Sequence, residues 1–239
     1  MTKKLDGRLA LVTGASRGIG AATAKALAAE GAHVILVART VGGLEEVEEA
    51  IHEAGGNATI APLDLVDGDS IARLAAAIGE RWDALDILVL NAAILGSLTP
   101  VAQIEAKELS EVMTLNFTAQ QALIAAFDPM LKKSERGHVI ALTSSVGAAP
   151  RAFWGAYGAS KAALDTLVAA YGEEVKNLAP LKVAIVDPGA TATDMRKLAY
   201  PGEDQSALKP PEAVADAIVE LATGDFETGH RTKVEYPDA

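Results

Sequence analysis

The stretch RLALVTGASRGIG (residues 8–20) runs from an apolar segment straight into a glycine-rich turn. Its first six residues have the length and composition of a buried strand, and a helical pattern follows to about residue 31. Glycines at such a turn let the backbone approach a phosphate, and the helix N-terminus supplies free N–H groups and a partial positive charge. The stretch therefore predicts the start of a nucleotide-binding α/β domain. A tight turn with purely structural glycines is the alternative.

The same alternation of apolar runs and helical patterns continues along the chain. Further strands are predicted at residues 33–38, 58–63, 86–91, 138–143 and 182–187. Further helices are predicted at residues 43–55, 69–82, about 104–131, 157–178 and 209–222. Six alternations predict an α/β fold, a doubly wound parallel sheet with helices on both faces, in a single domain over residues 1–239. The tail RTKVEY (residues 231–236) is predicted to be a seventh strand.

Composition limits the class of protein. The chain has 239 residues, a formal net charge of −11 and no cysteine. The acidic charge and the lack of a basic stripe argue against a nucleic-acid partner. Without cysteine, and with four dispersed histidines, we expect no disulfide bond and no metal site. The start MTKKLDGRLALVTG has no apolar signal core, and no apolar run approaches the ~18 residues of a membrane helix. We therefore expect a cytoplasmic protein with no membrane contact.

The end of the second predicted strand indicates which nucleotide binds. The glycines have the spacing G-x-x-x-G-x-G, and the strand ends VART, with Arg39 and Thr40 near the position where NAD-binding sheets carry an acidic residue. A guanidinium suits a 2′-phosphate, and Arg17 in the glycine turn is placed to bind the same group. Two cations without a carboxylate favour NADPH over NADH. A solvated Arg39 at the end of a strand is the alternative.

The segment AYGASKAA (residues 156–163) places Tyr157 and Lys161 four positions apart. That spacing on a helix is ~6 Å of rise and returns to nearly the same face. A nearby ammonium favours the phenolate, so we expect Lys161 to lower the pKa of Tyr157 from its usual ~10. The small residues between the two would leave room for a cofactor and a substrate. A pair on the helix surface is the alternative for this segment taken alone.

These segments together resemble the short-chain dehydrogenase/reductase family, in its compact single-domain form. The resemblance covers nearly the whole chain from about Leu5. It rests on TGASRGIG, LDL (63–65), LNAA (90–93), TLNFT (114–118), TSS (143–145), YGASK (157–161) and DPGATATDM (187–195). It implies a Rossmann-type fold. The family's usual N-A-G is Asn91-Ala92-Ala93 here, and the added methyl of Ala93 would either crowd the backbone near the cofactor or be tolerated.

The resemblance implies four catalytic residues. Tyr157 would donate its proton to the carbonyl oxygen of the substrate as a hydride arrives from NADPH, and Lys161 would also hold the nicotinamide ribose. Ser144, in preference to Ser145, would orient the carbonyl. Asn116, expected within the long helix at 104–131, would hold a water that relays protons toward Lys161. The alternative for Asn116 is a core asparagine bonded to its own helix.

The resemblance also implies a set of residues that bind the cofactor. Asp64 and Leu65 would lie against the adenine, although Asp64 would alternatively cap a helix that begins near Asp67. Asn91 and its neighbours would line the adenosine side, and the segment after the sixth strand would flank the nicotinamide. The full set is Gly14, Ser16, Arg17, Gly18, Ile19, Gly20, Arg39, Thr40, Asp64, Leu65, Asn91, Ala92, Ala93, Tyr157, Lys161, Pro188, Gly189 and Thr191.

Three loops beyond the carboxyl ends of the strands are expected to form the mouth of a substrate pocket. The candidate contacts are Leu95, Gly96, Trp154 and Met195, with a packing or interface role as the alternative for Trp154. Residues 193–208 are polar and contain a Pro-Gly pair, as a short mobile lid would.

We therefore predict an NADPH-dependent oxidoreductase that reduces a ketone or aldehyde, or runs in reverse, on a small-molecule substrate. A 3-oxoacyl-thioester reductase stays open as an alternative, and so does a catalytically silent NADPH-binding sensor or scaffold. A sugar-nucleotide epimerase is disfavoured by the glycine spacing and by the lack of a substrate domain. The resemblance implies a homotetramer or homodimer.

Overall fold

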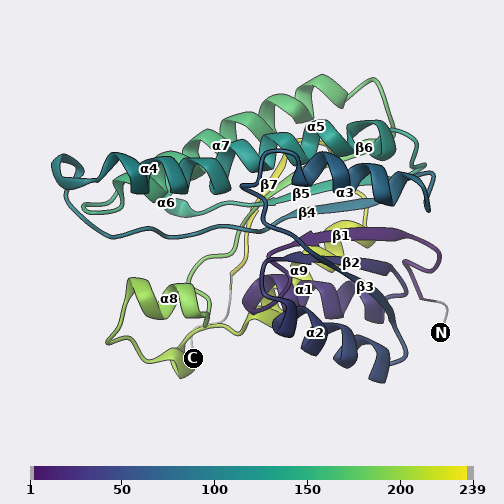
Figure 1. Cartoon of the computed structure of the whole chain (residues 1–239), viewed down its shortest axis with the longest axis horizontal. Helices are drawn as coiled ribbons and strands as arrows, with labels where there is room; N and C mark the ends of the chain where they lie inside the picture. The colour runs from purple at the N-terminus through teal and green to yellow at the C-terminus, as the bar shows by residue number, and fades with distance from the viewer. Residues whose placement is uncertain (1–2, 236–239) are drawn as a thin grey trace.

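The computed structural model describes residues 3–235, which form a seven-stranded sheet in the order β3-β2-β1-β4-β5-β6-β7 (Figure 1). The strands are β1 (Leu9–Thr13), β2 (His33–Ala38), β3 (Asn57–Pro62), β4 (Ile87–Leu90), β5 (Gly137–Leu142), β6 (Leu181–Asp187) and β7 (His230–Lys233). The helices are α1 (Gly18–Ala29), α2 (Val41–Glu53), α3 (Ser70–Gly79), α4 (Ala106–Met113), α5 (Ala119–Leu131), α6 (Ser145–Ala148), α7 (Gly155–Val175), α8 (Asp194–Ala199) and α9 (Pro211–Thr223). Adjacent strands pair in parallel throughout the sheet.

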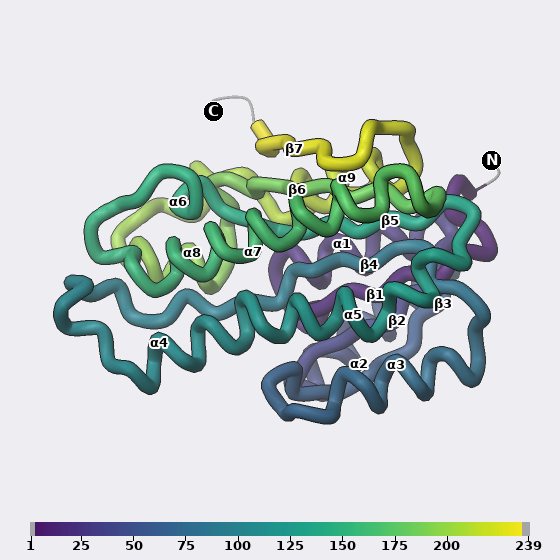
Figure 2. Tube along the Cα trace, turned by 90° about the horizontal axis from the view of Figure 1, so that it is seen from above, coloured from purple at the N-terminus to yellow at the C-terminus, as the bar shows by residue number. Residues whose placement is uncertain are grey.

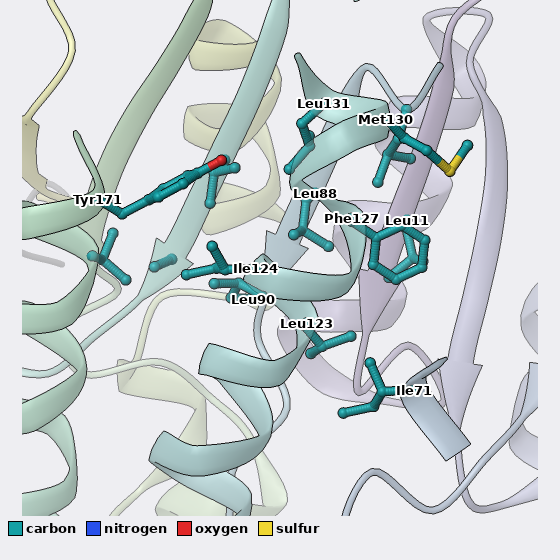
Figure 3. Close-up of a cluster of buried hydrophobic side chains, with 14 of the residues drawn as sticks. Leu11, Ile71, Leu88, Leu90, Leu123, Ile124, Phe127, Met130, Leu131 and Tyr171 are labelled. Carbon is teal, nitrogen blue, oxygen red and sulfur yellow. The ribbon is translucent and has the colours of Figure 1, made fainter. Parts of the chain in front are cut away.

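Alternate residues of the central strands enter two separate cores. Leu9 and Leu11 of β1 pack with α3, α5 and α7, whereas Ala10 and Val12 pack with α1, α2 and α9. This follows from the two-residue period of a strand, and it explains why β1 is buried at every position and apolar up to Thr13. Figure 1 shows the two helix layers on opposite faces of the sheet, and Figure 3 shows Leu11 beside Phe127 of α5 in the first core. The predicted doubly wound parallel sheet is confirmed.

The tail forms the predicted seventh strand, although it is shorter than expected. β7 pairs in parallel with β6, with Ile185 beside Arg231. Tyr236, the last residue of the predicted strand, lies outside the described residues. The prediction of one domain over residues 1–239 also extends beyond the described part at both ends, and it stays a prediction. Within residues 3–235, no helix is long and apolar enough to cross a membrane.

The strand order brings four loops to one place. From β1 the chain winds outward to β2 and β3, then returns to add β4 on the other side of β1. Ligands in such sheets bind beyond the carboxyl ends of the strands where the winding direction changes. The loops after β1, β4, β5 and β6 meet there. The short helices α6 and α8 lie at this end with α4, on the left of Figures 1 and 2.

The predicted continuous helix at 104–131 is wrong. The segment consists of α4 and α5 joined by a π-helical turn at Thr114–Thr118. A π-turn fits one extra residue into a helix and is frequent at functional sites. Asn116 lies in this π-turn and not in a regular α-helix, and its side chain is buried.

Candidate active site

A cavity of about 540 Å³ opens at the carboxyl ends of β1, β4, β5 and β6. The elements that reach it are far apart in the sequence: the glycine turn, the ends of β2 and β3, the loops after β4 and β5, the first turns of α7, and α8. Almost every residue predicted for the cofactor, the substrate or catalysis lines this cavity, and the exceptions are Gly20 and Asn116. The structure thus brings the predicted residues together in one site.

The glycine turn has the backbone that the sequence predicted. Gly14 and Gly18 have φ of 66° and 55°, in the left-handed region that favours glycine. Gly20 has another function, because a Cβ there would lie 2.6 Å from the Asn91 side-chain nitrogen and still closer to the Gly14 carbonyl oxygen. Gly20 therefore lets α1 pack directly against the turn. Among the described residues, no side chain caps the N-terminus of α1, which leaves its N–H groups available to an anion.

The two predicted cations stand at the edge of the cavity, each near one carboxylate. Arg39 Nη1 lies 3.9 Å from Asp64 Oδ2, and Arg17 Nη1 lies 3.8 Å from Asp194 Oδ2. All four side chains are exposed, and such pairs contribute about 0–1 kcal/mol. Either arginine can therefore exchange its carboxylate for a phosphate at a small cost in free energy.

The alternative function of Asp64 as a helix cap is wrong. The helix that follows begins at Ser70, and its N-cap position is Asp69. The Asp64 carboxylate instead accepts a hydrogen bond from the backbone N–H of Val66 at 3.2 Å. Its other oxygen faces Arg39, and Asp64 lines the cavity beside Leu65.

Thr13 was not singled out from the sequence, yet it joins the ends of β1 and β4. Its hydroxyl donates to the Val89 carbonyl (3.1 Å) and accepts from the backbone N–H groups of Asn91 and Ala92 (3.0 and 3.1 Å). The Asn91 side chain donates in turn to the Thr13 carbonyl at 2.8 Å. These bonds hold the two loops that form the floor of the cavity, and a buried threonine at the end of the first strand is the signal that points to them.

The alanine that replaces the family glycine stands on unstrained backbone. Within residues 3–235, Phe153 alone has a side chain on left-handed backbone, at φ 73°. Ala93 is therefore free of the strain that a methyl would meet at a position suited to glycine. It lines the cavity beside Ala92.

Two of the three small residues between Tyr157 and Lys161, Gly158 and Ser160, are closely packed, which differs from the predicted reason. A Cβ on Gly158 would lie 3.1 Å from the Val146 carbonyl, because α6 crosses α7 closely. Ser160 is buried, and its hydroxyl donates to the Tyr157 carbonyl at 2.7 Å. These residues let α6 and the π-turn approach α7, and the prediction that they make room for a cofactor and a substrate is wrong for Gly158 and Ser160.

The predicted lowering of the Tyr157 pKa by Lys161 is wrong for this structure. Burial of the phenol raises the pKa of Tyr157, and the negative charge of Asp187 raises it further. The Lys161 ammonium donates to the Leu142 carbonyl at 2.8 Å and lies 5.8 Å from the centre of the Tyr157 ring. Burial lowers the pKa of Lys161 to about 8, against the opposing effect of Asp165. Desolvation thus outweighs the attraction between the ammonium and a phenolate.

Ser144 and Asn116 lie on two elements that pack against α7, namely α6 and the π-turn. Ser144 is the N-cap of α6 and lines the cavity, whereas Ser145 lies within α6 and does not line the cavity. The Asn116 side chain accepts from the Ile94 N–H (2.9 Å) and donates to the Ile94 carbonyl (2.8 Å) and to the Ser160 hydroxyl (3.0 Å). The alternative of an asparagine bonded to its own helix is wrong, because these bonds attach the loop after β4 to α7.

The buried ammonium of Lys161 is expected to make stability depend on pH. Its pKa is about 8 in the folded protein against 10.5 as the ordinary value, so the folded state disfavours the charged form. The stability associated with this group is complete above pH ~10.5 and is lost as the pH falls toward 8. One pKa unit corresponds to about 1.4 kcal/mol, so the full change is about 3 kcal/mol.

Urea unfolding of the wild type and of Lys161→Met between pH 7 and 10 measures this change. The unfolding free energy of the wild type should increase relative to that of Lys161→Met as the pH rises. Lys25→Met, at an exposed position on α1, removes the same charge and is the control. A wild type and Lys161→Met whose free energies run parallel over this range would contradict a depressed lysine pKa.

The end of the cavity beyond Tyr157 is apolar and aromatic. Leu95, Val146 and Tyr157 form a small buried cluster. Leu98, Trp154, Met195 and Ala199 pack against it. The centre of the Trp154 ring lies 6.0 Å from the centre of the Tyr157 ring and 5.9 Å from the centre of the Tyr200 ring. Trp154 therefore lines the cavity and packs within it at the same time.

Three residues at this end lie in the segment 193–208, which was predicted to be a lid, but were not singled out individually from the sequence. Arg196 of α8 lines the cavity, stacks on Tyr200 and forms an ion pair with Glu203. Arg196, Tyr200 and Glu203 come together because the chain turns back after α8. No sequence motif with the spacing of these three residues marks a site.

Residues 8–204 match the family model described as short chain dehydrogenase. The uncharacterized oxidoreductase YciK of Escherichia coli strain K12 is 37% identical over 224 residues, which are 92% of this chain and 88% of that protein. A short-chain dehydrogenase structure from Pseudomonas syringae has a TM-score of 0.93 and 37% identity, over 98% of this chain and 97% of that one. A short-chain dehydrogenase from Escherichia coli CFT073, crystallised with NADPH, has a TM-score of 0.91 and 34% identity, over 99% of this chain and 100% of that one.

The family model covers most of the chain, and the structural match extends over almost all of it. The glycine turn, the Tyr157–Lys161 pair and the segment after β6 occupy one cavity, as the motifs of the resemblance implied. The protein therefore belongs to the short-chain dehydrogenase family and is an NAD(P)-dependent oxidoreductase.

Proposed function

We propose that this protein is an NADPH-dependent reductase of ketones or aldehydes that also catalyses the reverse oxidation, with Tyr157 as the general acid and base. The observation that supports the proposal most strongly is that Ser144, Tyr157 and Lys161 line the same cavity as the glycine turn. The apolar walls near Tyr157 favour a small uncharged carbonyl compound over a nucleotide sugar.

The cavity fits a dinucleotide with a 2′-phosphate. The left-handed glycines and the uncapped start of α1 suit the pyrophosphate, and Arg17 and Arg39 suit the 2′-phosphate. The structure from Escherichia coli CFT073 was crystallised with NADPH, which supports the same choice here. When bound, NADPH supplies the hydride for reduction of the carbonyl carbon.

The side chains of the site would handle the proton. The raised pKa of Tyr157 keeps its phenol protonated at neutral pH, so a proton is available to the carbonyl oxygen of the substrate. The Ser144 hydroxyl would donate a hydrogen bond to the same oxygen and fix its position. The positive charge of Lys161 would stabilise the phenolate left after transfer, and its ammonium would replace the lost proton. Asn116 would hold the loop after β4 in place.

Turnover tests the proposal. NADPH and NADH oxidation are followed with aldehydes, ketones and 3-oxoacyl thioesters, with Tyr157→Phe in parallel. Turnover of simple ketones or aldehydes that is lost in the variant is the expected result. Turnover of thioesters alone would favour the acyl-thioester alternative, and NADPH binding without turnover of any compound would favour a sensor.

The homodimer or homotetramer stays a prediction, and a measurement of the molecular mass in solution decides it.

Replacing Arg39 with aspartate is expected to shift cofactor preference toward NADH. The variant loses a charge-assisted bond to the 2′-phosphate, worth about 1.5–3 kcal/mol, and places a carboxylate beside it. The ratio of kcat/KM for NADPH to that for NADH should fall by ~10-fold to 100-fold. Lys107→Asp, on α4 and outside the cavity, changes the net charge equally and is the control. An unchanged ratio in Arg39→Asp would remove Arg39 from the cofactor site.

A further inference from the structure

Arg196 is the cation of α8 that lines the apolar end of the cavity, and Glu203 and Tyr200 both contact its guanidinium. Nε donates to Glu203 Oε2 at 2.5 Å, and Nη2 donates to Glu203 Oε1. The guanidinium carbon lies 3.8 Å above the centre of the Tyr200 ring. The side chains of Arg196 and Glu203 are only 21% and 28% exposed. This is a bidentate, stacked and partly buried ion pair, which is stronger than an ordinary surface pair.

The other charged groups near this end point elsewhere. Asp194 lies between Arg17 and Lys197, at 3.8 and 3.7 Å. Lys161 donates to the Leu142 carbonyl, and Arg151 donates to the Tyr200 hydroxyl at 3.4 Å. Apart from Arg196, the cavity beyond Tyr157 is lined mainly by the apolar side chains of Leu95, Trp154, Met195, Leu198 and Ala199. The charge of Arg196 is thus balanced by Glu203 before any substrate enters.

We infer that Glu203 determines specificity: by occupying Arg196, it makes the substrate end neutral and apolar, so that the enzyme takes uncharged carbonyl compounds with an apolar flank and rejects those that carry a carboxylate. The inference rests on the proposed function and names the substrate class of that same site. A free arginine in this wall would bind a carboxylate through two parallel hydrogen bonds. Here a substrate carboxylate would have to displace Glu203, whose partly buried charge would lose its partner.

The pair of ketones acetophenone and 4-acetylbenzoate tests the inference, because they differ only by a carboxylate. We expect the wild type to prefer acetophenone, judged by kcat/KM with NADPH. In Glu203→Gln the guanidinium is released, and the ratio of kcat/KM for 4-acetylbenzoate to that for acetophenone should rise by ~10-fold or more, mainly through KM. The double variant Arg196→Gln/Glu203→Gln is the matched control, and it should lose the gain.

Binding gives a second readout that does not depend on turnover. The chain has two tryptophans, Trp82 and Trp154, so Trp154 is the single reporter in a Trp82→Phe background. Quenching of its fluorescence gives the Kd of each ketone, and Glu203→Gln should tighten 4-acetylbenzoate relative to acetophenone. A shifted Kd ratio would support the specificity inference even without turnover of either ketone, and the wider panel of aldehydes, ketones and thioesters decides the proposed reductase separately.

Four results would overturn the inference. The first is a wild type that prefers 4-acetylbenzoate, and the second is a substrate ratio that is unchanged in Glu203→Gln by both readouts. The third is a failure of acetophenone to quench Trp154 at all. A variant that loses both ketones equally would show that the ion pair only braces α8, and it too would overturn a specificity function.

Discussion

Replacing Tyr157 with phenylalanine is expected to reduce kcat by ~100-fold to 10,000-fold, the range that general acid catalysis provides. The change removes the one hydroxyl that we assign to proton transfer and keeps the ring. That ring packs with Leu95 and Val146 in the small cluster, so the cavity should keep its shape. NADPH should therefore bind the variant with nearly the wild-type Kd.

The measurements are NADPH oxidation with the best substrate and the Kd for NADPH from its fluorescence. Tyr200→Phe is the matched control, because the Tyr200 ring packs near Trp154 as the Tyr157 ring does. Its hydroxyl accepts only a long hydrogen bond from Arg151, so removing it should change kcat by a few-fold at most. A Tyr157→Phe protein that retains more than about a tenth of wild-type kcat would exclude Tyr157 as the acid.

Replacing Gly20 with alanine is the second change with a large expected effect. The new methyl would overlap the Gly14 carbonyl and lie 2.6 Å from the Asn91 side-chain nitrogen. Neither group can yield easily, because Gly14 is backbone in the turn and Asn91 is bonded to Thr13. Helix α1 must therefore move away from the turn. Overpacking of this kind destabilises by about 1–3 kcal/mol.

The displacement of α1 would also move the N–H groups that face the cavity, so the Kd for NADPH should rise at least ~10-fold. Thermal unfolding and NADPH titration measure the two effects. Gly42→Ala is the matched control: Gly42 is also helical, and its Cβ would meet nothing within 4 Å. That variant should be unchanged or more stable by up to about 1 kcal/mol. Normal stability and normal NADPH affinity in Gly20→Ala would mean that the turn is more adaptable than its geometry implies.

The central strands were predictable because of where parallel strands lie. β1, β2 and β5 are covered by helices on both faces, so nearly every residue is apolar and the run ends where the burial ends. The glycine turn was predictable for a related reason, since left-handed backbone at Gly14 and Gly18 leaves little choice of residue. The edge strand β7 has mostly exposed side chains, and its predicted bounds were correspondingly less accurate.

Features that depend on contacts between distant segments were not predictable. The π-turn at Thr114–Thr118 lies inside a longer stretch with helical spacing, which does not mark it, and its position follows from the bonds of Asn116 to Ile94 and Ser160. The raised pKa of Tyr157 depends on how completely neighbouring loops remove water from the phenol, and spacing along a helix contains no such information.

The sequence by itself determined the order of strands and helices, the glycine turn, and the residue types at the carboxyl edge of the sheet. These depend on local periodicity and on backbone angles, which each short segment expresses on its own. The tertiary structure alone decided that Gly158 is small because α6 crosses α7, that Lys161 is directed at Leu142, and that Glu203 occupies Arg196. Each of these depends on which surfaces meet in space, because packing and desolvation act between segments that are distant in the chain.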